Sequence, residues 1–214
     1  MSRSKGMRVL PILATLATAC AGPGAMHQAT IMGQCATDDA ACSRRHPVAP
    51  IAVGARFHPE VEAAIDGTTT PNLHIESAAP AVLAVDGDTL VAKQAGASAV
   101  LISTDDGSVV DFVHMWVAPV TGITLARRDG DRLATGVGLA VGEDLTIAPG
   151  LWNGVQRLGG DADLQWTSSN PGALEILRDG SPDRRRLRAR APGKTTVTVA
   201  LGDLKTSIDV EVVQ

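Results

Sequence analysis

From residue 48 onward, hydrophobic and polar residues alternate in short runs. Val, Ile and Leu occupy most of the hydrophobic positions, as in residues 113–117, 195–199 and 208–212, and Gly, Pro, Asn or Asp separates one run from the next. Alternation with a period of two predicts antiparallel strands that bury one face. No long helical period interrupts the pattern. We therefore predict an all-β fold.

Two stretches of this region match each other, which predicts a tandem repeat. Residues 73–85 match 164–176, residues 90–102 match 187–199, and residues 107–117 match 202–212. Upstream, Ala52-Val53-Gly54 matches Ala140-Val141-Gly142, but the first strand of the first copy is not evident from the pattern. We predict two β-sheet domains, residues 48–118 and residues 119–214.

Residues 1–19 have the pattern of a secretory signal peptide. Three basic residues precede an apolar run over residues 9–19, which is shorter than the roughly 20 residues that a transmembrane helix needs. The end of this run, Ala17-Thr18-Ala19-Cys20, resembles the lipobox of bacterial lipoproteins. The resemblance implies that Cys20 carries a lipid and anchors the mature chain in a membrane. Ordinary cleavage after Ala19 is the alternative. Residue 21 is Ala rather than Asp, which favours the outer membrane.

Residues 20–47 are rich in Ala, Gly and small polar residues, and we predict that they form a lipid-anchored tether. A flexible coil of this length reaches about 30 Å. A marginal helix over residues 35–45 is the alternative. An exported chain permits a disulfide between Cys35 and Cys42, and two free thiols are the other option. With His46, these cysteines offer too few ligands for zinc.

Composition and motifs exclude several functions. The formal net charge is −4, and the chain has three Trp, two Phe and no Tyr, which argues against nucleic-acid binding and against an antibody-type domain. No nucleophile elbow, phosphate-binding glycine loop or closely spaced histidine pair occurs. The Asp-Gly pairs are typical of hairpin turns and lack the spacing of a calcium loop. We expect no enzyme activity, no cofactor and no metal.

The second copy also resembles a known family. Its residues 166–171 read Trp-Thr-Ser-Ser-Asn-Pro, and residues 187–199 lead through Ala-Pro-Gly-Lys-Thr into a Val-rich strand. Both segments resemble the group 2 bacterial immunoglobulin-like domain. The first copy is degenerate, since Ile75 stands where the second has Trp166. The resemblance implies two tandem immunoglobulin-like β-sandwiches that serve as spacers, adhesion modules or binders of surface ligands.

Two sets of side chains are candidates for ligand contact. Arg186, Arg188 and Arg190 alternate with small or apolar residues, so they project from one outer strand face, where guanidinium groups can hold phosphates or an acidic glycan. The alternative is a solvated strand that resists edge aggregation. Trp116 and Trp152 are candidate contact anchors. Packing in a core or at a domain junction is the alternative for both.

Taken together, the sequence predicts a non-enzymatic lipoprotein of the cell envelope, in the outer membrane, that acts as a structural, adhesion or protein-interaction module. The expected partners are the membrane, through the lipid anchor, and an envelope protein or glycan. Binding of carbohydrate or of an acidic glycan is the alternative function.

Overall fold

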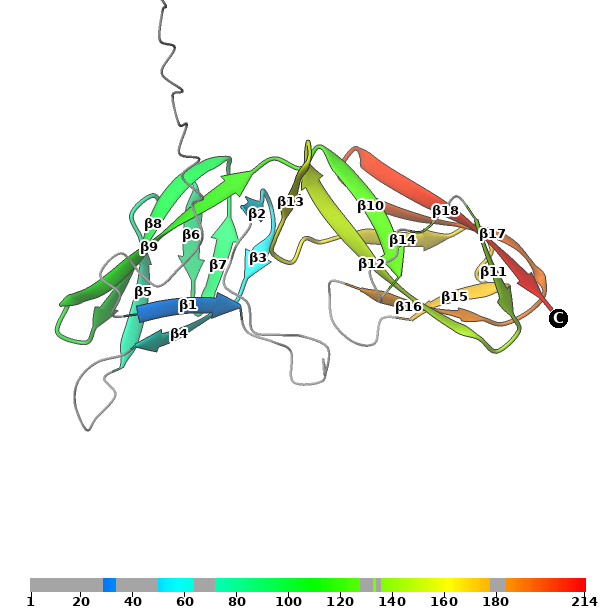
Figure 1. Cartoon of the computed structure of the whole chain (residues 1–214), viewed down its shortest axis with the longest axis horizontal. Coiled ribbons are helices and arrows are strands. Elements are labelled where there is room, and N and C mark those ends of the chain that lie inside the picture. Colours follow the sequence, from blue (N-terminus) through cyan, green and yellow to red (C-terminus); the bar gives the residue numbers. More distant parts are fainter. Residues whose placement is uncertain (1–28, 34–49, 64–71, 128–132, 134–135, 178–183) are drawn as a thin grey trace, which may run out of the picture.

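The computed structural model describes residues 29–33, 50–63, 72–127, 133, 136–177 and 184–214. Every regular element in these ranges is a β-strand (Figure 1), which confirms the predicted all-β fold. In the described part of the chain, no helix has the length and apolar character needed to cross a membrane. The candidate modification residues Cys20, Cys35 and Cys42 lie outside the described residues.

The C-terminal half is a sandwich of two sheets. Its strands are β10 (Gly122–Arg127), β11 (Gly136–Ala140), β12 (Asp144–Asn153), β13 (Gln156–Leu158), β14 (Gln165–Ser168), β15 (Leu174–Leu177), β16 (Arg185–Ala189), β17 (Gly193–Leu201) and β18 (Leu204–Val213). One sheet has the order β10-β12-β16-β15, with β13 paired to β12, and the other has the order β11-β18-β17-β14. Two sheets in this order define an immunoglobulin-like sandwich.

The N-terminal half repeats this arrangement. Its strands are β1 (Ala29–Gly33), β2 (Ile51–Ala52), β3 (Arg56–Phe57), β4 (Pro59–Ala63), β5 (Leu73–Ser77), β6 (Leu83–Asp86), β7 (Thr89–Ala92), β8 (Gly96–Thr104) and β9 (Val109–Ala118). The larger sheet has the order β2-β9-β8-β5. On the opposite layer, β3-β7-β6 and the pair β1-β4 together match the sheet β10-β12-β16-β15.

Individual hydrogen bonds recur in the two halves, which confirms the repeat read from the sequence. The buried hydroxyl of Ser98 accepts a hydrogen bond from the backbone N–H of Ala79 at 3.1 Å. At the matching place, the buried hydroxyl of Thr195 accepts one from the N–H of Asn170, also at 3.1 Å. Each half also joins a short strand in parallel to its last long strand, β2 to β9 and β11 to β18.

Strand β1 supplies the first strand of the N-terminal sandwich, which the sequence pattern did not reveal. It lies at residues 29–33, inside the segment predicted to be a tether, and pairs with β4 as β10 pairs with β12. Ile31 lies opposite Val61 and is only 1% exposed, and Leu125 takes the same place in the C-terminal half. The predicted tether is therefore interrupted by a strand, which buries Ala29 and Ile31 and pairs with β4 at all five positions.

A buried carboxylate holds the beginning of this strand. Asp111 of β9 is fully buried, and its Oδ2 accepts a hydrogen bond from the backbone N–H of Ala29 at 2.9 Å. Its Oδ1 accepts another from the N–H of Phe112 at 2.8 Å. A buried carboxylate is costly unless it is hydrogen-bonded, so the contact between β9 and β1 is specific.

Replacing Ile31 tests whether β1 belongs to the folded body. We expect Ile31→Ala to lower the free energy of unfolding by about 2–5 kcal/mol, since it removes a buried aliphatic side chain and leaves a cavity. Denaturant unfolding measures the change. Val155→Ala, at a position that is 97% exposed, is the control and should change stability by less than about 0.5 kcal/mol. Equal effects of the two substitutions would show that β1 is not part of the core.

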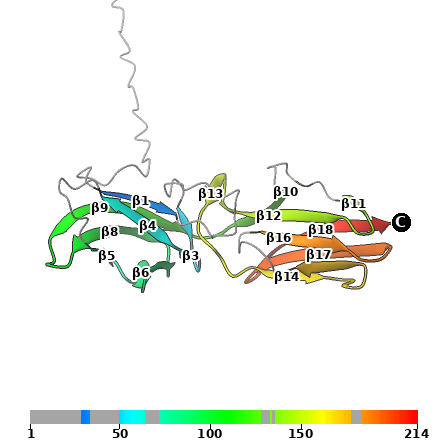
Figure 2. The ribbon, with the colours of Figure 1, turned by 90° about the horizontal axis from the view of Figure 1, so that it is seen from below.

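The two halves lie end to end (Figures 1 and 2). Backbone hydrogen bonds join them. Ala52 donates to the carbonyl of Gly159 at 3.0 Å, and Gly159 donates to the carbonyl of Pro50 at 2.8 Å. Arg56 and Asp161 exchange a pair of bonds at 2.9 and 2.7 Å. A segment of the C-terminal half thus pairs with the edges of both sheets of its neighbour.

Apolar packing closes the same junction. Leu151 and Leu158 of the C-terminal half belong to one buried cluster with Ile51 and Ala55 of the N-terminal half. Gly160 packs against Ile51 and Ala55 and has a φ of +85°. A Cβ at this position would stand 2.9 Å from Ile51 Cγ2 and 3.0 Å from Ala55 Cβ. Only glycine fits both this backbone conformation and this close approach.

The junction makes a testable demand on Gly160. Gly160→Ala and Gly54→Ala both place alanine at a φ above +80°, but nothing lies within 4 Å of a Cβ at Gly54. Both variants should lose about 1–2 kcal/mol from the left-handed backbone conformation. Gly160→Ala should lose about 1–3 kcal/mol more through overpacking. Equilibrium unfolding compares the two variants, and equal losses would show that the junction is not tightly packed.

Candidate functional site

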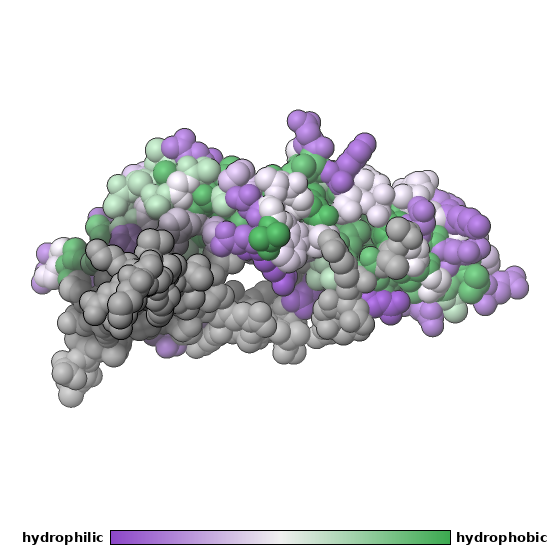
Figure 3. Space-filling model, turned by 45° about the horizontal axis from the view of Figure 1, so that its top comes forward, coloured by the Kyte–Doolittle hydropathy of each residue, from purple (hydrophilic) through white to green (hydrophobic). Residues whose placement is uncertain are grey.

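The outer face of the sheet β2-β9-β8-β5 carries a cluster of apolar and aromatic side chains. We name it the aromatic face; it consists of Ala97, Ala99 and Leu101 of β8 and Phe112, His114 and Trp116 of β9, which lie opposite one another in pairs. The two strands lie side by side in the left part of Figure 1. Figure 3 shows many hydrophobic residues among hydrophilic ones on the coloured surface of the N-terminal half.

The three rings of the aromatic face form a row along β9. The ring centroids of Phe112 and His114 are 5.5 Å apart at an interplanar angle of 78°, and those of His114 and Trp116 are 6.3 Å apart at 48°. Trp116 is 43% exposed, and its partner across the ladder is the small residue Ala97. His114 is exposed too.

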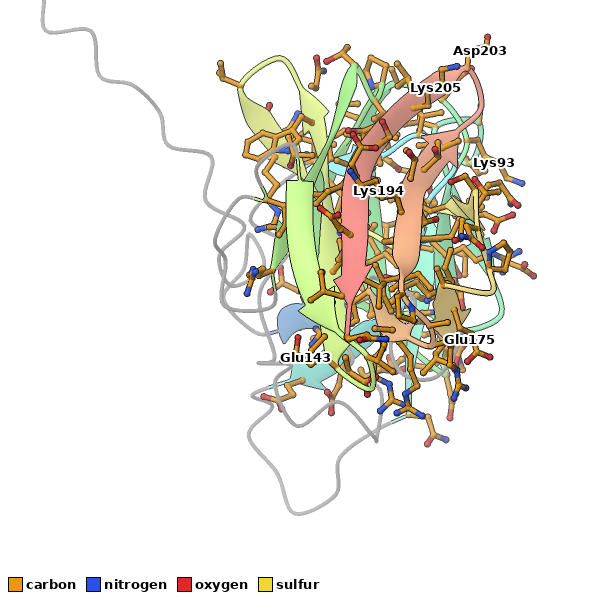
Figure 4. The ribbon with its side chains drawn as sticks, turned by 90° about the vertical axis from the view of Figure 1, so that its right-hand side faces the viewer. Lys93, Glu143, Glu175, Lys194, Asp203 and Lys205 are labelled. Carbon is orange, nitrogen blue, oxygen red and sulfur yellow. The ribbon has the colours of Figure 1, made fainter. Side chains whose placement is uncertain are left out.

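The C-terminal half has polar residues at the same six positions: Lys194, Thr196 and Thr198 of β17, and Ser207, Asp209 and Glu211 of β18. There, the hydroxyl of Thr196 donates to Asp209 Oδ1 at 2.7 Å, and Lys194 Nζ lies 3.7 Å from Glu211 Oε1. Figure 4 shows Lys194 beside β18. The same sheet face is therefore polar in one half and aromatic in the other.

The predicted arginine contacts lie on the other sheet of the C-terminal half and face carboxylates. Arg188 makes a bidentate contact with Asp144: its Nε donates to Oδ1 at 2.8 Å, and its Nη2 donates to Oδ2 at 2.9 Å. Arg186 Nη1 lies 3.5 Å from the same carboxylate. Arg190 donates through Nε to Glu175 Oε2 at 2.7 Å, and Figure 4 labels Glu175 at the right of the view. An anionic ligand would have to compete with these carboxylates.

These contacts change the titration of Asp144. The hydrogen bonds from Arg188 are the largest effect and lower the pKa of Asp144 below its ordinary 3.8. Desolvation, the second-largest effect, raises the pKa, and the positive charges of Arg188, Arg186 and Arg190 lower it further. The folded pKa thus lies below the unfolded one. The contact stabilises the folded protein at neutral pH, and this contribution is lost as the pH falls through the folded pKa.

Arg188→Gln tests the assignment. We expect the pKa of Asp144 to return toward its ordinary value, because the charged two-pronged donor is gone. A carboxyl-detected NMR titration measures the pKa. Arg190→Gln is the matched control and should move it less, since Arg190 acts on Asp144 only through its charge and is the weakest of the named causes. The reverse order would contradict the role given to Arg188.

The other polar candidates have structural partners. Trp152 is half-buried, and its Nε1 donates to the hydroxyl of Thr124 at 2.8 Å, which joins β12 to β10. His74 is exposed and contacts Asp105, whose pKa is lowered chiefly by that hydrogen bond. Among the described residues, no three His, Cys, Asp or Glu side chains are placed to hold a metal ion.

A groove that the sequence did not predict lies at the β11 edge of the sheet β11-β18-β17-β14. Its volume is about 530 Å³, and its walls include Gly136 and Gly138 of β11 together with Lys194, Asp209 and Glu211. The two glycines of β11 carry no side chain above the sheet, and this hollows the surface. The signal available in the sequence was the spacing Gly136-x-Gly138.

Comparison with known proteins gives structural similarity without a family. No protein-family model and no curated protein matches the sequence. Domains 4 and 5 of the S-layer protein SbsC align with 87% of this chain and 98% of their own, at 16% identity and a TM-score of 0.35. The Yersinia pseudotuberculosis adhesin InvE aligns with 77% of this chain and 57% of its own, at 11% identity and a TM-score of 0.34. A beta-glycosidase from Bacteroides vulgatus aligns with 75% of this chain and 23% of its own, at 17% identity and a TM-score of 0.34. Similarity at this level does not define the function of this chain.

Proposed function

We propose that the protein is a non-enzymatic module of the cell envelope, anchored in the outer membrane through a lipid on Cys20, that acts in structure, adhesion or protein interaction. The observation that carries the proposal is the junction, at which residues 159–161 pair with both sheets of the N-terminal half. Two sandwiches held in this way form an extended body suited to spacing or display. The export signal in the sequence supports the location.

The position of β1 brings the folded body close to the proposed anchor. Only nine positions separate Cys20 from Ala29, the first residue of β1. A flexible coil of that length reaches roughly 15–18 Å, compared with about 30 Å for the whole predicted tether. In this proposal the N-terminal sandwich lies near the membrane surface, and the C-terminal sandwich extends from it.

The two remaining cysteines have a role in the same proposal. Cys35 and Cys42 fall between β1 and β2, in a connection over residues 34–50, whereas the matching connection between β10 and β11 covers residues 128–135. A longer connection costs more entropy to close, and a disulfide lowers that cost by restricting the unfolded chain. We assign a disulfide to this pair.

Carbohydrate binding is the second candidate function, and the aromatic face favours it more than the arginines do. The contacts of Arg188 and Arg190 with Asp144 and Glu175 reduce the positive charge available to an acidic glycan. Trp116, by contrast, is exposed in the other half of the molecule. The arginine row and this tryptophan therefore do not form one combined site.

The anchoring proposal is tested with Cys20→Ala. We expect wild-type mature protein to carry a lipid mass on Cys20 and to fractionate with membranes, and the variant to lack both properties. Mass spectrometry of the N-terminal peptide, together with membrane fractionation, measures them. Cys35→Ala is the control and should remain lipidated and membrane-bound. An unmodified Cys20 in the wild-type protein would overturn the proposal.

A further inference from the structure

The repeat provides an internal comparison for the aromatic face. Leu101, His114 and Trp116 occupy the places of Thr198, Asp209 and Glu211 in the C-terminal half. In both halves the other face of the strand is buried and apolar: Val113, Met115 and Val117 in β9, and Ile208, Val210 and Val212 in β18. Because the C-terminal sandwich keeps this face polar, the fold itself does not require aromatic residues there. An exposed apolar patch bordered by polar residues marks an interaction surface.

We propose that the aromatic face binds neutral carbohydrate, with one sugar ring stacked on Trp116 and the next lying along the row toward His114 and Phe112. This inference specifies a ligand for the interaction role proposed above and rests on that role. The π-face of an aromatic ring is electron-rich, and the C–H groups on one side of a pyranose ring are electron-poor, so the two attract when stacked. Ala97 presents only a methyl group opposite Trp116 and leaves room beside the indole.

The surroundings of the face favour a ligand without net charge. No Lys, Arg, Asp or Glu is among its six residues, in contrast to the C-terminal copy. Exposed Glu76 of β5 lies opposite Leu101 at the margin, where its carboxylate can accept hydrogen bonds from sugar hydroxyls. The imidazole of His114, inside the row, offers a second polar group. An apolar surface with a few polar groups at defined places is the usual composition of a small-ligand site.

The size of the face argues against a second copy of this chain as the ligand. From Phe112 to Trp116, β9 covers about 14 Å, and the neighbouring strand lies about 4.8 Å away. Such a face is far smaller than the roughly 800 Å² per partner that a stable protein interface buries. A linear chain of a few sugar rings, by contrast, has a length similar to that of the row.

The experiment titrates full-length protein with soluble neutral oligosaccharides of two to six sugars, from the gluco-, manno-, xylo- and chito- series, and follows tryptophan fluorescence and calorimetry. We expect at least one series to bind and Trp116→Ala to weaken that binding about tenfold or more. Trp116→Phe should retain part of the affinity. Glu211→Ala, at the matching place of the C-terminal half, is the control and should bind like wild type.

Several outcomes would overturn the inference. It is wrong if no series binds the folded protein, or if Trp116→Ala and Glu211→Ala bind as well as wild type. Concentration-dependent dimerisation that Trp116→Ala removes, without sugar binding, would instead assign the face to self-association. Circular dichroism checks that the variants are folded, which we expect for substitutions at an exposed position. Membrane anchoring is measured separately, so an anchored protein that binds no sugar contradicts this inference alone.

Discussion

Three consecutive residues, Gly159 to Asp161, form the connection on which the arrangement of the molecule depends. Their backbone groups pair with Pro50, Ala52 and Arg56, at the edges of two sheets that belong to the other half. Backbone hydrogen bonds are directional, and the buried apolar cluster that contains Leu158 and Ile51 packs beside them. Because Gly160 has no Cβ, the two segments of the chain approach closely enough for the hydrogen bonds and the apolar packing to form together. Two sandwiches that a flexible linker would leave independent are thereby joined.

The two halves share a framework and differ in their surfaces. Strand order, parallel closing strands and the buried hydroxyls of Ser98 and Thr195 are common to both. The C-terminal half carries a polar face on one sheet and paired arginines on the other, where Asp144 and Glu175 balance much of the positive charge. The N-terminal half carries the aromatic face instead. The two halves therefore share the pattern of buried positions and differ at the exposed ones.

Much of the fold followed from the sequence because burial on one side of a strand leaves a period of two. That signal located the strands β9, β17 and β18 and the repeat. It missed β1, since a strand of five residues with one large buried side chain produces no sustained alternation. The pairing of Ile31 with Val61 exists only after residues distant in sequence have come together. The predicted tether was too long for that reason.

For the candidate sites, the sequence alone identified residue types, and alternation along the strand was enough to place Arg188 on an outer face. For Trp116 it left a surface position and a packed position open, and the structure shows the residue exposed. Partners across a sheet and between halves depend on register and docking, which only the tertiary structure decided. Asp144 lies 44 positions before Arg188, and no local pattern connects them. The repeat in the sequence already pairs Trp116 with Glu211, and the contrast between them became meaningful once the sheet register showed that both lie on the outer face of their sheets. Local periodicity determines which way a side chain points, whereas long-range packing determines what it meets.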